Sequence, residues 1–357
     1  MKTRLIPSAL TIVAATLLAT ASPSAAGGVS AIVRISTDAT GKATASDIWS
    51  YALSPDGAHL AFSAWGDGLL PGVRDTVRTI YNKNIWTGAI ERVTDTCCAV
   101  ADDHSDIPLY TPDGGGIGFT SLATNLVAKD TNRRQDVFLR SLTSASMIRL
   151  DLNAKGGQAN GDAYDFAFSP DGKSVAFTSA ATNLVGGDLN GARDIFLEDL
   201  ATGAVRRVST GSSGGQSYPF SLGGPTFLPD GKSIAFFSDA PDLVPAGWRR
   251  QVVEVYIKRI GSGIVSRACT NAYGEQLNGG CFTLYGDYAS RPSFTPNGRS
   301  MVMETASDNV LARDDGSRPQ VYLKNLVTNA VKPLCVTKAG KPADGTCMQP
   351  VLSPDGT

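Results

Sequence analysis

The sequence contains, at residues 168–179, the stretch Phe168-Ser169-Pro170-Asp171-Gly172-Lys173-Ser174-Val175-Ala176-Phe177-Thr178-Ser179. Close copies begin at Leu53, Tyr110, Phe227 and Phe294, and the opening of the pattern returns at Leu352. Successive copies lie about sixty residues apart, a spacing typical of proteins that repeat one supersecondary unit. The chain is therefore predicted to be a repeat array, in which each unit packs on its neighbours within one body.

Each copy predicts a β-hairpin. Proline presets φ at the first turn position, aspartate tolerates the second, and glycine takes the left-handed conformation that closes the turn. Apolar residues alternate before the turn, and Val175-Ala176-Phe177 resumes a strand after it. A third strand is expected at residues 194–200 and a fourth at residues 204–209. The unit is thus a four-stranded antiparallel meander.

Such meanders in series, with hardly any helical periodicity, are typical of an all-β propeller. A β-sandwich is the alternative, but its strands do not usually repeat one turn tripeptide at a fixed period. We expect whole blades at about residues 47–94, 106–150, 164–210, 223–270 and 290–337.

A sixth blade is expected from the two ends of the chain. Residues 31–37 match the fourth strand of the third repeat but precede any first strand, and residues 348–357 supply an innermost strand. Propellers commonly close by pairing strands from both termini. The last of six blades would lack its two middle strands, so we expect the sequence to be a truncated form of a longer protein. A natural C-terminus after Thr357 is the alternative.

The repeated Ser-Pro-Asp-Gly-Lys-x-(Val/Ile)-Ala-Phe, the later Asp194-Ile195-Phe196 and the closing Arg207-Val208-Ser209-Thr210 resemble the WD40-like (PD40) repeats of the TolB-like propeller family. The resemblance runs from Ala31 to the C-terminus. It implies a propeller fold and a binding or scaffold role in the cell envelope. It also suggests an envelope partner such as a peptidoglycan-associated lipoprotein.

The N-terminus predicts export. Lys2 and Arg4 precede an apolar run over residues 5–19, and Ser24-Ala25-Ala26 suits cleavage of a signal peptide over residues 1–26. The run is shorter than the roughly 20 apolar residues of a spanning helix, so no membrane span is expected after cleavage. A secreted or periplasmic location follows. The formal net charge is −1 and no basic stripe stands out, which argues against nucleic acid and leaves a protein or a cell-envelope glycan as the expected partner.

The loops after the second and fourth strands of each blade emerge at one end of the ring, because neighbouring strands run in opposite directions. We call this end the long-loop face. Loops longer than about twelve residues are often functional, so ligand binding is expected there.

Two of these loops contain Asp-x-Asn-x-x-x-Asp and supply candidate metal ligands at Asp130, Asn132, Asp136, Asp188, Asn190 and Asp194. Such oxygen ligands suit Ca²⁺. The alternative is Asx-turn chemistry that only shapes the loop, and no other cofactor is expected.

Six cysteines in an exported chain suggest disulfides. Cys269 with Cys281, and Cys335 with Cys347, occupy equivalent places in two repeats and are expected to form local pairs. Cys97 and Cys98 remain, and a vicinal disulfide, an intermolecular bond or free thiols are all open.

Weak candidates for catalysis also exist. Asp47, Asp165 and Asp287 precede innermost strands, where a propeller lyase or glycosidase would place carboxylates around its channel. His104 lies among aspartates near the start of the second blade, although a solvated charged loop explains that cluster as well.

The primary hypothesis is a non-enzymatic propeller that binds a protein or cell-envelope ligand through the long-loop face. The alternatives are a polysaccharide hydrolase or lyase, with or without dependence on Ca²⁺, and a recognition domain of a larger polypeptide.

Overall fold

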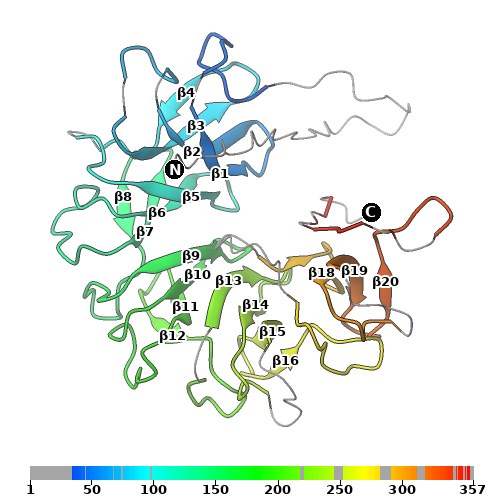
Figure 1. Cartoon of the computed structure of the whole chain (residues 1–357). Coiled ribbons are helices and arrows are strands. Elements are labelled where there is room, and N and C mark those ends of the chain that lie inside the picture. The colour runs from blue at the N-terminus through cyan, green and yellow to red at the C-terminus, as the bar shows by residue number, and fades with distance from the viewer. Residues whose placement is uncertain are drawn as a thin grey trace, which may run out of the picture.

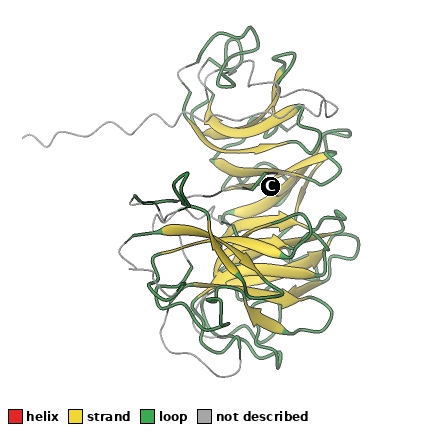
Figure 2. Ribbon diagram, turned by 90° about the vertical axis from the view of Figure 1, so that its right-hand side faces the viewer, coloured by secondary structure: helices red, strands yellow, loops and turns green. Residues whose placement is uncertain are grey.

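The computed structural model describes residues 34–353, apart from 45, 67, 74, 97–98, 218–220, 245–251, 282–290, 312–317, 341–342, 344, 349 and 351. The expected signal peptide and the chain from residue 354 onward lie outside this description. The described part consists of strands and loops, without an α-helix (Figure 2).

Twenty strands form five four-stranded antiparallel sheets, each an up-and-down meander in chain order. The first sheet comprises β1 (Ile48–Leu53), β2 (His59–Trp65), β3 (Arg78–Asn84) and β4 (Ile90–Arg92). The second comprises β5 (Ser105–Tyr110), β6 (Gly116–Ser121), β7 (Asp136–Ser141) and β8 (Met147–Arg149). The third comprises β9 (Ala163–Phe168), β10 (Ser174–Ser179), β11 (Asp194–Asp199) and β12 (Val205–Arg207). The fourth comprises β13 (Ser221–Phe227), β14 (Ser233–Ser238), β15 (Glu254–Arg259) and β16 (Val265–Arg267). The fifth comprises β17 (Ser293–Phe294), β18 (Ser300–Thr305), β19 (Gln320–Asn325) and β20 (Val331–Pro333).

The five sheets follow one another around a common centre (Figure 1). This arrangement of meanders is a β-propeller, and we call the sheets blades one to five. The predicted all-β propeller is confirmed, whereas the count of six blades stays a prediction.

The turns between first and second strands have the conformation that the Pro-Asp-Gly sequence predicts. In blade three, Gly172 has φ of 68°, and Ser169 donates to Asp171 Oδ1 at 2.6 Å. The Asp171 carboxylate also accepts the backbone N–H of Lys173 at 3.1 Å, and the Ser169 bond in particular holds the pKa of Asp171 below its ordinary value. The tripeptide and the residues directly beside it thus shape the hairpin turn through local contacts.

The hydrophobic core lies between successive blades. One buried cluster joins Ile195 and Val208 of blade three to Phe236 and Tyr256 of blade four. Gly118 shows how closely the sheets approach, because a Cβ there would meet Phe166 of the next blade at 2.7 Å. Each blade therefore buries its apolar face on its neighbour, as a repeat array must.

The described part of the expected N-terminal strand, residues 34–37, makes a single bridge, from Thr37 to Ala43. An equivalent bridge joins Thr210 to Gln216 in the loop that enters blade four. Ile35 packs on the core of blade one. Residues 34–44 therefore lie against blade one as an inter-blade loop does, and the expected pairing with residues 348–357 falls partly outside the described residues.

Candidate functional site

Asparagine side chains fasten the stems of the loops on the long-loop face. Asn183 donates from Nδ2 to the carbonyl of Gln158 at 2.8 Å and accepts from the N–H of Asn160 at 3.0 Å. Asn125 and Asn309 make the same two contacts in their own blades, at 2.7–3.1 Å. In each case the loop after strand two is joined to the loop that enters the blade. The asparagine that recurs after the second strand is thus a structural clamp.

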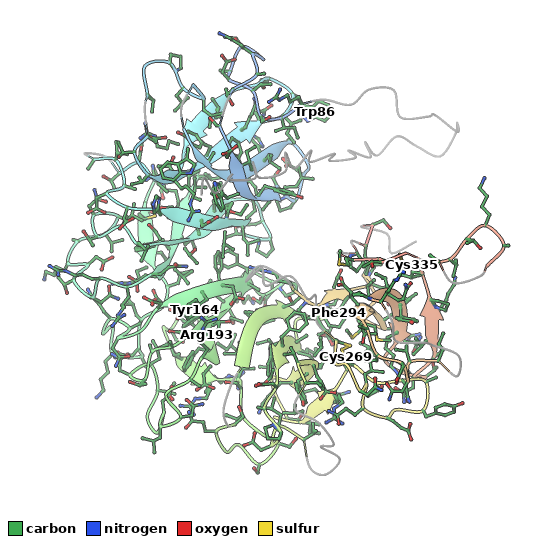
Figure 3. The ribbon with its side chains drawn as sticks, viewed as in Figure 1. Trp86, Tyr164, Arg193, Cys269, Phe294 and Cys335 are labelled. Atoms are coloured by element: carbon green, nitrogen blue, oxygen red, sulfur yellow. A yellow bond between two sulfur atoms is a disulfide. The ribbon has the colours of Figure 1, made fainter. Side chains whose placement is uncertain are left out.

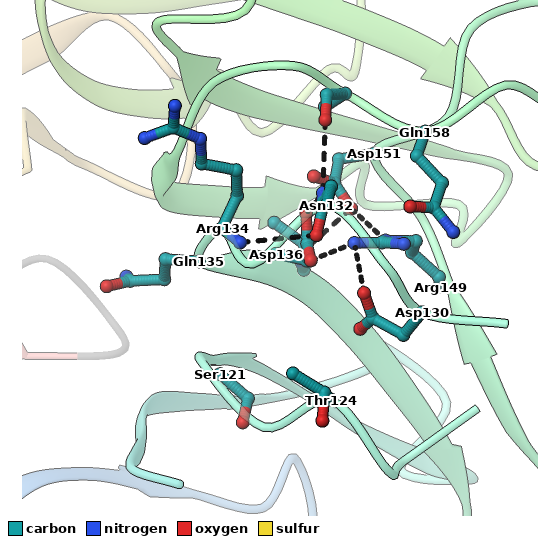
Figure 4. A network of polar contacts seen from close by, with 12 residues as sticks. Ser121, Thr124, Asp130, Asn132, Arg134, Gln135, Asp136, Arg149, Asp151 and Gln158 are labelled. Atoms are coloured by element: carbon teal, nitrogen blue, oxygen red, sulfur yellow. Dashed lines mark hydrogen bonds and ion pairs between the residues drawn. The ribbon is translucent and has the colours of Figure 1, made fainter. Parts of the chain in front are cut away.

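The first expected metal-ligand set surrounds an arginine (Figure 4). Arg149 Nη2 pairs with Asp136 and, at 3.3 Å, with Asp130, while Nε lies 3.4 Å from Asp151. Asn132 donates to Asp136 and accepts the backbone N–H of Arg134, which is an Asx turn. Burial raises the pKa of Asp130 despite the nearby guanidinium. In this geometry the arginine carries the positive charge at the centre of the set.

The second set repeats this arrangement. Arg207 lies 3.3 Å from Asp188 and 3.4 Å from Asp194, and Gln216 donates to both carboxylates. Asn190 again donates to the aspartate at the start of the third strand and accepts a backbone N–H two residues on. Burial raises the pKa of Asp194.

The arginine recurs at the end of the fourth strand in blades one and four. Arg92 pairs with Asp75 at 2.9 Å, and Arg267 pairs with Glu254 at 2.7 Å. The sequence shows this recurrence as an arginine that ends the fourth strand in blades one to four, whereas blade five has Pro333 there. Within the described residues there is no group of three or more His, Cys, Asp or Glu side chains able to hold a metal ion.

The candidate catalytic aspartates that the structure describes, Asp47 and Asp165, have different surroundings. Asp47 is exposed, and Asp165 is only 2% exposed and accepts the N–H of Gly224 at 2.6 Å. Burial raises the pKa of Asp165, which the charge of Arg291 opposes. Asp287 lies outside the described residues.

His104 has a positioning role in the structure. Its Nδ1 accepts the backbone N–H of Arg78 at 2.9 Å, and its ring meets Trp65 edge-on at 5.1 Å. Thr124 Oγ1 donates a hydrogen bond to Oδ2 of the neighbouring Asp102 at 2.7 Å. His104 therefore joins the start of blade two to the third strand of blade one.

An aromatic–arginine pair that the sequence did not predict lies at the start of β1. The guanidinium of Arg78 lies 4.7 Å from the ring centroid of Trp49 and 3.5 Å from Asp106. Asp106 also accepts from Ser63 at 2.7 Å and from Ser50, which fixes the carboxylate. Trp49 is 61% exposed, so this pair presents a flat ring and a cation to solvent on the long-loop side of the innermost strand.

Blade three has the equivalent pair. Arg193 lies 3.6 Å above the ring of Tyr164, and Figure 3 shows the two side chains next to each other. Tyr164 remains partly exposed although blade two covers the adjacent face of its sheet. The pair in blade one therefore recurs at the same end of an innermost strand in blade three, and we call this place of blade one, at Trp49 and Arg78, the channel mouth.

Two further residues of β1 are exposed for a different reason. Tyr51 and Leu53 are 53% and 47% exposed. Their counterparts in blade three, Phe166 and Phe168, pack on Gly118 of the preceding blade. Tyr51 and Leu53 thus lie on the face that a preceding sheet covers elsewhere in the fold.

Two disulfides join Cys269 to Cys281 and Cys335 to Cys347, the pairs expected from their equivalent places. The first pair is buried at the junction of blades four and five, and the second is partly exposed. Cys97 and Cys98 lie outside the described residues.

The chain has partial similarities to several known proteins. No protein-family model matches the chain. Dipeptidyl-peptidase 5 of Porphyromonas gingivalis is 30% identical over 99 residues, which amount to 28% of this chain and only 13% of that protein. TolB from Acinetobacter baumannii is 21% identical over 87% of this chain and 56% of its own, with a TM-score of 0.43.

Two more solved structures are similar. The putative TolB from Agrobacterium tumefaciens is 18% identical and covers 82% of this chain and 81% of its own, with a TM-score of 0.48. An oligogalacturonate lyase in complex with manganese is 14% identical and covers 78% and 65%, also with a TM-score of 0.48. None of these similarities assigns an activity to this chain. Among the described residues, no helix has the length and apolar character needed to cross a membrane.

Proposed function

We propose that this chain is an exported TolB-like propeller that binds a protein of the cell envelope at the channel mouth on its long-loop face. The observation that carries the proposal is the exposed ring of Trp49 with the guanidinium of Arg78 at 4.7 Å. Tryptophan, tyrosine and arginine dominate the energetically important positions of protein interfaces, because they combine a large apolar surface with directed hydrogen bonds.

The charges at this mouth suggest the character of the bound segment. Arg78 pairs with Asp106 at 3.5 Å, and this carboxylate is partly exposed. The guanidinium of Arg78 can therefore also donate hydrogen bonds to a carboxylate of a ligand. Trp49 offers an apolar face beside it. A polypeptide segment with an acidic and an apolar side chain in succession fits both groups.

Export is supported by the two disulfides, because such bonds persist in oxidising compartments. We also propose that a sixth blade closes the ring. Residues 348–357 repeat the innermost-strand sequence, and Tyr51 and Leu53 offer the apolar face on which a sixth blade would pack.

The enzymatic alternative needs carboxylates open to the channel. Asp165 is enclosed, whereas Asp47 is exposed and Asp106 is engaged by Ser63. The burial of Asp165 supports binding over polysaccharide cleavage, because an enclosed carboxylate cannot reach a substrate. Loss of turnover on a polysaccharide in Asp47→Asn and Asp165→Asn variants would favour the alternative.

The test uses a photo-crosslinking amino acid at position 49 of the full chain, with position 86 as the matched control. Trp86 is also exposed, at 67%, but lies in the turn between β3 and β4 at the opposite end of the blade. The protein crosslinked from position 49 is then purified and titrated against wild type, Trp49→Ala, Arg78→Ala and Trp86→Ala.

We expect the Trp49→Ala and Arg78→Ala variants to bind at least about tenfold more weakly, and Trp86→Ala to bind as wild type does. Binding that is unchanged in Trp49→Ala refutes the proposed site. Crosslinks to carbohydrate, with binding competed by purified peptidoglycan sacculi, would replace the protein partner with a glycan.

A further inference from the structure

A basic side chain occupies one position of the third strand in blades one, two, four and five. In β15, Lys258 pairs with Ile234 of β14 and Val265 of β16. Its Nζ donates to the carbonyl of Thr210 at 2.7 Å and to that of Gly211 at 3.3 Å, in the loop that enters the blade. The contact between blades three and four thus contains a side-chain cation surrounded by main-chain oxygens. We call such a contact between neighbouring blades a seam.

The same contact recurs at the other three positions. Lys83, Arg140 and Lys324 have the register of Lys258 within their sheets. They donate to carbonyls of the corresponding loops, those of Thr37, Asp95 and Asn271, at 2.5, 2.8 and 2.7 Å respectively. A cation at this place is therefore part of how neighbouring blades are joined.

Blade three has a glutamate at this position. Glu198 pairs with Val175 and Val205, which is the register of Lys258. The loop before it has the same backbone pattern, since Leu152 bridges to Gln158 as Thr210 bridges to Gln216. The carbonyls of Leu152 and Asn153 therefore stand where those of Thr210 and Gly211 receive the ammonium group of Lys258. A carboxylate at this place faces oxygens of like partial charge.

The buried carboxyl groups in the seam between blades two and three have too little positive charge nearby to balance them. Glu198 is 7% exposed and Asp151 is fully buried, and Glu198 Oε2 and Asp151 Oδ2 have no hydrogen-bond partner. Burial first, and the charge of Asp151 second, raise the pKa of Glu198 to about 8. Asp151 shares Arg149 with Asp130 and Asp136, so this one guanidinium already serves three carboxyl groups with buried side chains. Uncompensated buried charges are costly, and this seam is short of positive charge.

We propose that a Ca²⁺ ion binds in the seam between blades two and three, held by the carboxylates of Glu198 and Asp151 and by carbonyl oxygens of the loop at Leu152 and Asn153. Ca²⁺ takes roughly six to eight oxygen ligands in flexible geometry, including carboxylates, main-chain carbonyls and waters. Mg²⁺ demands near-ideal octahedral geometry and gives up its waters reluctantly, so it fits less well. The ion replaces the side-chain cation that joins the other described blades.

The proposal is tested with the full chain after dialysis against a chelator. Thermal unfolding and calorimetric titration are measured with CaCl₂ and with MgCl₂ at constant ionic strength, for wild type, Glu198→Lys, Glu198→Gln and Glu275→Lys. Glu275 is an exposed glutamate in an inter-blade loop and serves as the control. Glu198→Lys restores the arrangement of Lys258, and Glu198→Gln covers the case in which the lysine variant does not fold.

We expect one Ca²⁺ per wild-type chain and a melting temperature that rises with Ca²⁺ concentration, with a smaller response to Mg²⁺. Both Glu198 variants lose the response, Glu198→Lys matches or exceeds the ion-free wild type in stability, and Glu275→Lys behaves as wild type. A wild type that does not respond to Ca²⁺ refutes the proposal. A full response in Glu198→Gln also refutes it, because the ion would then bind elsewhere, for example at the loop carboxylates around Asp130.

Discussion

Lys83 donates a hydrogen bond from Nζ to Thr37 Oγ1, 2.6 Å away, and Lys258 makes the equivalent bond to Thr210 Oγ1 at 2.5 Å. The second pair joins two blades. The first pair joins blade one to residues 34–44, which precede every strand of the described propeller. These N-terminal residues are thus anchored by the chemistry of an inter-blade loop.

Replacing Lys83 by methionine should release this segment. Lys83 is 3% exposed, and its loss leaves the carbonyls of Thr37 and Asp38 without their donor. We expect the free energy of unfolding to fall by about 1–3 kcal/mol. Limited proteolysis should cut faster near Gly41, whereas Lys173→Met, at an exposed turn position, should change neither measurement. Equal cleavage rates in wild type and Lys83→Met would contradict the anchoring role.

Arg149 should be among the residues most sensitive to substitution. Arg149→Met leaves Asp130, Asp136 and Asp151 buried without their cation, which we expect to cost about 3–5 kcal/mol of unfolding free energy in chemical denaturation. Adding Asp136→Asn removes one of the uncompensated charges and should restore part of the loss. Arg134→Met, an exposed control two residues before β7, should be neutral. A double variant no more stable than Arg149→Met would show that the charge balance is not the cause.

The two disulfides should differ in accessibility. Cys269 and Cys281 are 0% and 3% exposed, whereas Cys335 and Cys347 are partly exposed. Mild reductant without denaturant should therefore open the Cys335–Cys347 bond first, as measured by alkylation and peptide mass mapping. Replacing Cys269 and Cys281 by alanine should cost about 2–4 kcal/mol of stability. Simultaneous labelling of all four cysteines would contradict this order.

Asp165 should make stability fall as pH rises. Burial raises the pKa of its carboxyl group in the folded state, so the folded protein holds this proton to higher pH than the unfolded chain does. The stabilisation is complete below the ordinary aspartate pKa of about 4 and is lost as pH rises through the higher folded value.

The isosteric Asp165→Asn variant has no such proton to lose. The stability of wild type relative to this variant, measured by chemical denaturation at several pH values, should therefore decline from acid toward neutral pH. A relative stability that increases with pH would mean that Arg291 outweighs burial.

The local turn chemistry explains why the fold was predictable. Ser169, Pro170, Asp171 and Gly172 specify their hairpin through contacts within five residues, so the sequence carries the information in one place. Val175 and Phe177, which are fully buried, then pair with Phe168 and Phe166 in the register that this turn sets. Repetition of this unit predicts the propeller.

The candidate site was less predictable because its contacts join distant residues. Asp130 and Asp136 look like oxygen ligands in their own loop, and only the fold shows Arg149, from the next strand, between them. Trp49 and Arg78 are separated by a whole hairpin, and nothing local to either indicates that they meet. A comparison of equivalent positions along the repeats would have found the arginines, and would have marked Glu198 as the exception.

The asparagine clamps at Asn125, Asn183 and Asn309 have an evolutionary consequence. They fasten the stems of the long loops, while the tips beyond them carry exposed side chains such as Leu189 and Tyr273, which are 89% and 82% exposed. Mutations at the tips do not disturb the clamps or the core, so they are nearly neutral for folding. The sequence of the loop tips can therefore vary while the framework that holds the loops stays the same.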